Sequence, residues 1–176
     1  MEHKDFSANH QLLICLSCLP QKILSLYSAD NITEFVLHEL CSEHYLDIEQ
    51  AAYFVDNPDF NCFVGVAGYS RSERYAEEES HWHSPDLFSD HMRKCGYNKK
   101  IRAINRTSFT KCNKNEQAIV DAIGQELGFT NPRCLKWNLK HNNHGILIIN
   151  PSEQREQGLE DYLLKGLYLL GFCPIF

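Results

Sequence analysis

The stretch that most constrains the fold is CLKWNLKHNNHGILIIN, from Cys134 to Asn150. In CLKWNLK, Leu135 and Trp137 fall on one side of an extended chain and Lys136 on the other, which is the period of a half-buried strand. HNNHG supplies the Asn and Gly that favour a tight reversal. ILII is apolar at successive positions, as expected of a central strand. The run therefore predicts a β-hairpin with one strand inside a sheet.

A second hairpin is predicted upstream, over residues 50–69. QAAYFVD and NCFVGVAGY are rich in branched and aromatic residues, and the turn signal NPDF separates them. Gly65 and Gly68 weaken the second of these strands and indicate a bulge. KIRAINRTSF, residues 100–109, is predicted to be a third strand.

Several segments have apolar residues at helical spacing, with capping or breaking residues at their ends. Pro20 favours a break between two short helices, 10–19 and 20–29. Further helices are predicted at 31–46, 85–96, 113–129 and 158–172. The order of elements predicts an α+β fold, with a central antiparallel sheet of five or six strands and helices packed on one face. Residues 1–9 are polar and predict a flexible tail, and residues 10–176 a single domain.

Composition limits the function. The chain has 176 residues with 17 basic and 23 acidic side chains, which disfavours a direct nucleic-acid surface. No apolar run has the length of a membrane span, and the first residues lack a basic leader, so no membrane contact and a cytoplasmic location are expected. Most of the eight cysteines stand in apolar stretches, which favours reduced, buried thiols.

Three segments resemble the GAF-domain superfamily of small-molecule sensory domains, which are related to PAS domains. ITEFVLHELCSEHYLDIEQAAYFVD resembles the helix and first strand of that family, and NCFVGVAGYS its second strand. HGILII and the segment after it resemble the family's closing strand and helix. The resemblance implies a regulatory domain that binds a ligand beside its sheet, forms a homodimer, and stands at the N-terminus of a bacterial transcription activator. The apolar end LYLLGFCPIF is consistent with a longer protein. No site of the family transfers to this sequence residue by residue.

The polar segment 70–100 is rich in histidine and is interpreted as an insertion or lid. Its run HWHSPDLFSDHMRKC offers four ligands for zinc or iron: His81, His83, His91 and Cys95. In a helix, the last two would share a face. Cys112 or His144 could replace one of the four. The spacing fits no standard zinc motif, and a polar surface loop is the alternative interpretation.

Four other residues are candidates for binding an organic ligand. Tyr53, Trp82 and Trp137 could line a pocket, although aromatic residues on strands are more often part of the core. Arg102 could neutralise an acidic ligand. The pattern C-x-x-C at Cys15 and Cys18 has redox spacing, but its apolar setting favours a core stripe.

These features favour a sensory domain that binds a small molecule or a metal and controls a linked output domain, with transcription as the expected output. Two alternatives remain open from the sequence. One is a thiol- or metal-dependent enzyme that uses Cys95 and Cys112 with His81 or His91. The other is a dimerisation module that binds no ligand.

Overall fold

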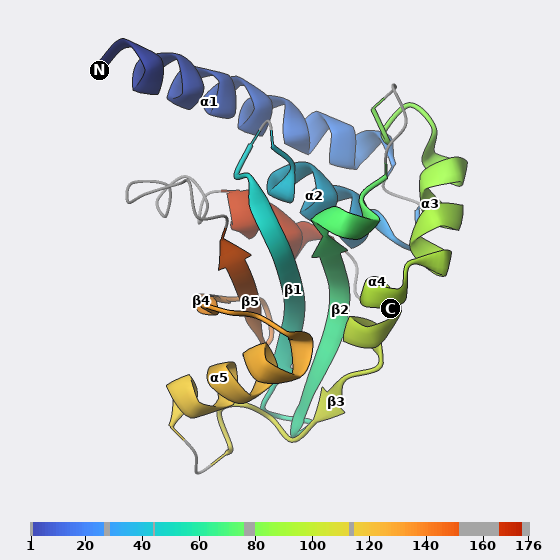
Figure 1. Cartoon of the computed structure of the whole chain (residues 1–176). Helices are drawn as coiled ribbons and strands as arrows, with labels where there is room; N and C mark the ends of the chain where they lie inside the picture. The colour runs from blue at the N-terminus through green and yellow to red at the C-terminus, as the bar shows by residue number, and fades with distance from the viewer. Residues whose placement is uncertain are drawn as a thin grey trace.

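A computed structural model of the chain describes residues 2–26, 29–43, 45–75, 80–112, 115–151 and 166–173. In this part of the chain, one antiparallel sheet forms in the order β3-β2-β1-β5-β4 (Figure 1). Its strands are β1 (Ile48–Asn57), β2 (Cys62–Ser70), β3 (Asn105–Arg106), β4 (Arg133–Asn138) and β5 (His144–Pro151). The predicted α+β class and the five-stranded central sheet are confirmed.

Both predicted hairpins form, and they share the sheet. Strand β5 lies between β4 and β1, so the ILII run is central as predicted. Between Tyr53 and Phe54 the register of β1 with β2 shifts, because Tyr53 pairs with Ala67 and Phe54 with Gly65. Val66 is therefore the extra residue of a bulge. This bulge stands where the glycines of β2 predict one.

Helices cover both faces of the sheet, whereas one face was predicted. The described helices are α1 (Glu2–Ser25), α2 (Ile32–Cys41), α3 (Pro85–Lys94), α4 (Gly96–Arg102) and α5 (Glu116–Leu127). Helices α1, α2 and α3 contribute to a first hydrophobic cluster, which contains Tyr53. Helices α4 and α5 contribute to a second cluster, which contains Phe54. Successive residues of β1 point to opposite faces, so an apolar run such as AAYFV needs cover on both sides.

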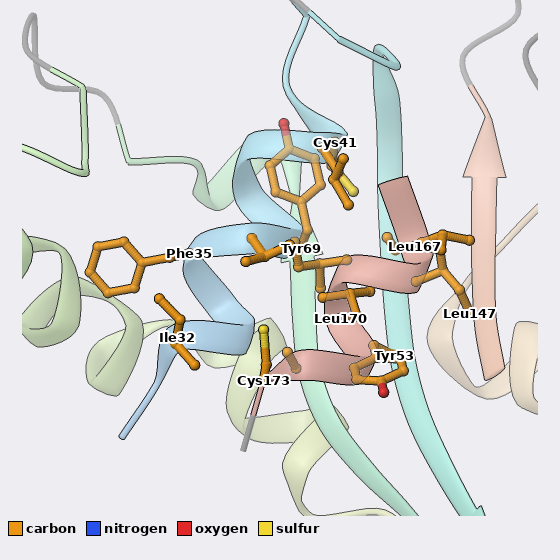
Figure 2. Packing of buried hydrophobic residues seen from close by; sticks show 14 of the residues in the cluster. Ile32, Phe35, Cys41, Tyr53, Tyr69, Leu147, Leu167, Leu170 and Cys173 are labelled. Carbon is orange, nitrogen blue, oxygen red and sulfur yellow. The ribbon is translucent and has the colours of Figure 1, made fainter. Parts of the chain in front are cut away.

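The first cluster is closed by the end of the chain. Figure 2 shows Leu167 and Leu170 beside Tyr53 and Leu147 of the sheet. Both leucines belong to or adjoin the short 3-10 helix η2 (Tyr168–Phe172). The predicted helix 158–172 falls largely on residues 152–165, which lie outside the described residues. The described part of segment 70–100 packs into the same cluster through Trp82, Phe88 and Met92, so it forms part of the core.

Two local predictions were wrong. Helix α1 runs through Pro20 without a break, because this residue is exposed and the helix loses only one backbone hydrogen bond there. Residues 2–9 belong to the same helix. Segment 100–109 is the end of α4 followed by a two-residue strand, since Ile101 and Ile104 both turn toward the second cluster. The predicted helix 113–129 forms as α5, which is capped by Asn115 and ends at Gly128, whose φ is 79°.

Candidate functional site

A cleft of about 840 Å³ lies where α2, α3 and α4 meet. Figure 1 shows α3 and α4 beside strand β2, and α2 near the upper part of β1 and β2. The volume falls in the range of small-molecule sites. The cleft is lined by Leu26, Ala29, Asp30, Asn31, Glu34, Pro85, Asp86, Ser89, Met92, Arg93, Asn98, Lys99 and Arg102.

The floor of the cleft is a buried polar network. Glu34 and Asn98 are each only 3% exposed. Glu34 Oε1 accepts hydrogen bonds from Asn98 Nδ2 at 2.8 Å and from Arg102 Nη1 at 2.9 Å. Asn98 Oδ1 in turn accepts from the backbone N–H of Gly68 at 2.9 Å. The network therefore joins α2, α4 and strand β2 beneath the cleft.

Local sequence explains how these groups reach the cleft. Glu34 stands in the first turn of α2, where the helix dipole favours a carboxylate. Pro85 begins α3, as its fixed φ favours. Ser89 Oγ donates to Asn31 Oδ1 at 3.1 Å and so ties α3 to the start of α2. The two walls of the cleft are thus held together by side chains at helix ends.

Of the four predicted ligand-binding residues, only Arg102 lines the cleft. Tyr53 and Trp137 stack on each other, with ring centroids 5.6 Å apart and planes at 9°. Both rings are buried in the first cluster, and neither lines the cleft. Tyr53 Oη and Trp137 Nε1 make no hydrogen bond within the described part of the chain. Burial raises the pKa of Tyr53 above its usual value.

Trp82 takes part in a second polar cluster, around Glu39. The Glu39 carboxylate accepts hydrogen bonds from Lys22 Nζ at 2.6 Å, Tyr45 Oη at 2.5 Å and Trp82 Nε1 at 2.8 Å. Burial acts to raise the pKa of Glu39, but these hydrogen bonds and His81 outweigh it and leave the pKa lowered. This cluster joins α1 to α2.

The predicted metal ligands are not brought together as a set of four. His91 Nε2 lies 3.2 Å from Cys95 Sγ, as their helical spacing indicated, and also 2.8 Å from the carbonyl oxygen of Glu73. His81 Nε2 instead lies 3.1 Å from the carbonyl oxygen of Phe35, and His83 is exposed. Among the residues that the structure describes, no three His, Cys, Asp or Glu side chains converge to hold a metal ion.

Seven cysteines of the described residues are free thiols: Cys18, Cys41, Cys62, Cys95, Cys112, Cys134 and Cys173. Burial, together with the nearby Glu73, raises the pKa of Cys95 to about 11. Burial raises the pKa of Cys173 to about 12, against the opposing effect of Thr33. These thiols are protonated at neutral pH and are weak nucleophiles.

Sequence reasoning missed Glu34, Glu39 and Asn98. A signal for the two carboxylates was present, because six of the ten residues of ITEFVLHELC are apolar and two are glutamates. All ten residues of α2 are buried. A buried carboxylate needs partners, so each of the two indicated a polar network. Nothing local marked Asn98.

None of the described helices combines the length and the apolar character of a bilayer-crossing segment. The chain matches no protein-family model and no curated protein sequence.

Proposed function

We propose that this chain is a signal-sensing regulatory domain of the GAF type, which binds a small-molecule effector in the cleft between α2, α3 and α4. Its output would be a linked domain that regulates transcription. The observation that supports this best is the hydrogen-bond network of the buried Glu34 and Asn98 with the half-exposed Arg102, on the floor of a cleft of ligand size. A few convergent polar groups in a concave site are typical of small-molecule binding.

The proposed mechanism is a population shift. An effector that contacts α2, α3 and α4 together would favour the state in which these helices are drawn together. Glu39 of α2 bonds Lys22 of α1, so a shift of α2 would reach α1. Leu13, Ile14 and Leu24 of α1 are exposed, which is compatible with the expected homodimer. Light scattering that finds only monomer at micromolar concentration would remove the dimer from this mechanism.

Replacing Arg102 by alanine is expected to weaken effector binding at least tenfold, because a guanidinium on the cleft floor is lost. A metabolite library should contain compounds that raise the melting temperature of the wild-type chain. At about 100 times the dissociation constant, the stabilisation is about 2.7 kcal/mol, or roughly 5–10 °C for a chain of this size. Differential scanning fluorimetry would measure the shift in both proteins.

Arg106→Ala is the matched control, because Arg106 is also a surface arginine in an ion pair, with Glu126, but does not line the cleft. It should respond to the effector like the wild type. The proposal fails if no compound stabilises the wild type, or if Arg102→Ala keeps the full response.

A thiol enzyme is the second candidate, favoured by the 3.2 Å contact between His91 and Cys95. The raised pKa of Cys95, about 11, speaks against it. We expect iodoacetamide to label Cys95 slowly at neutral pH, with a rate that rises about tenfold per pH unit as the thiolate fraction grows. Mass spectrometry can follow Cys95 and the exposed Cys18 in the same sample. Fast labelling of Cys95 that is constant from about pH 6 to 8 would favour the enzyme instead.

A further inference from the structure

The charged side chains around the cleft are balanced in sign. Three are acidic and three are basic: Asp30, Glu34 and Asp86, and Arg93, Lys99 and Arg102. A ligand with a large net charge of either sign would meet three like charges at close range. A ligand that carries one charge of each sign can pair both. The balance therefore points to a zwitterion.

Glu34 offers a place for the positive group of such a ligand. Its Oε1 already receives two hydrogen bonds, whereas its Oε2 makes none within the described part of the chain. Glu34 lines the cleft although it is almost fully buried. A carboxylate has about four acceptor positions, so Oε2 can accept from an ammonium group without disturbing Asn98.

Arg102 and Lys99 offer a place for the negative group. A guanidinium has five N–H donors in a fork that matches a carboxylate, and a single nitrogen of Arg102, Nη1, bonds Glu34. The Arg102 side chain is 47% exposed, so its other donors are accessible. Lys99 stands three residues earlier on α4, on the same side of the helix. In the described residues, Lys99 Nζ forms no salt bridge.

We infer that the cleft binds a free α-amino acid, whose ammonium is held by Glu34 and whose carboxylate is held by Arg102 and Lys99. The two charges of an α-amino acid lie on neighbouring groups, and Glu34 and Arg102 are correspondingly adjacent, 2.9 Å apart. The remaining wall is apolar at Leu26, Ala29, Pro85 and Met92, with Asn31 and Ser89 between them, and would receive the side chain. This inference rests on the proposed function.

The test is isothermal titration calorimetry of the full chain with each of the common free L-amino acids. At least one should bind with a dissociation constant below about 1 mM. Its N-acetyl derivative, which lacks the ammonium, and its amide, which lacks the carboxylate, should each bind at least tenfold more weakly. Glu34→Gln keeps the size of the side chain and should lose affinity for the amino acid tenfold or more. Glu116→Gln, an exposed residue of α5, is the matched control and should bind normally.

Failure of this inference can be told from failure of the proposed function. If no amino acid binds but another metabolite stabilises the chain in an Arg102-dependent way, the inference is overturned and the effector site stands. Equal binding of the N-acetyl derivative or of the amide shows a site for one charge only and also overturns the inference. If neither amino acids nor other metabolites bind, both fail. Should Glu34→Gln not fold, the two blocked derivatives still decide the question with the wild-type chain.

Discussion

Gly65→Ala is expected to lower the free energy of unfolding by at least about 3 kcal/mol, the upper end of overpacking costs. A Cβ atom at Gly65 would lie 1.9 Å from the carbonyl oxygen of Ile101 and 2.7 Å from its carbonyl carbon. These are backbone atoms of α4, so no side chain can turn away to relieve the contact. The Gly65 N–H also donates to the carbonyl of Ile104 at 2.9 Å, so moving α4 would break this bond. Urea denaturation would measure the loss.

Two other glycines give a graded control. At Gly68 an added Cβ would lie 2.6 Å from Cγ1 of Ile101, a side-chain atom that can move, so Gly68→Ala should cost less. At Gly96 the nearest atom is 3.4 Å away, an ordinary contact, and Gly96→Ala should change stability by less than about 0.5 kcal/mol. If all three variants are equally stable, α4 does not sit against β2. The cleft would then lose its floor, since Asn98 and Arg102 are on α4.

Lowering the pH from about 7 to about 4.5 is expected to cost roughly 2–3 kcal/mol of stability through His38 alone. Burial, reinforced by His81 and His91, lowers the pKa of His38 from 6.5 to about 3. Below pH 6.5 His38 becomes protonated in the unfolded chain, whereas in the folded chain it stays neutral until the pH falls to about 3. His38 therefore contributes its full stability above pH 6.5, and this contribution declines steadily as the pH falls toward 3. Denaturation curves at a series of pH values would show the decline.

His38→Phe separates this effect from other titrations. The His38 ring lies edge-on between Tyr69 and Phe88, at centroid distances of 4.9 and 5.0 Å, so a phenyl ring suits the site. The variant should lose most of the slope between pH 6.5 and 4.5. A smaller slope should remain, because burial also lowers the pKa of His81. His83→Phe, at an exposed position, should keep the wild-type slope. An unchanged slope in His38→Phe would show that His38 is not the group that titrates.

Most strands and helices could be predicted because their signals lie within a few residues of one another. The alternation in CLKWNLK and the apolar run ILII placed β4 and β5, and the run HNNHG placed the turn between them, although its left-handed residues are His141 and Asn142 and Gly145 belongs to β5. The strand predicted over 100–109 was wrong, because its apolar residues fit the period of a strand as well as that of a helix. The contact of Ile101 with β2 favours the helix. The prediction that helices cover only one face of the sheet failed, because the sequence pattern of a strand does not say what packs above and below the sheet.

Sequence alone determined the α+β class, both hairpins and the nearness of His91 to Cys95, since each depends on a local period of the backbone. Tertiary structure alone decided the cleft. Glu34 meets Asn98 across 64 residues, and Asn98 meets Gly68 across 30. Such contacts follow from how whole elements pack on the sheet, and no spacing within one segment encodes them. The same packing left Tyr53 and Trp137 in the core and brought Arg102 to the floor of the cleft.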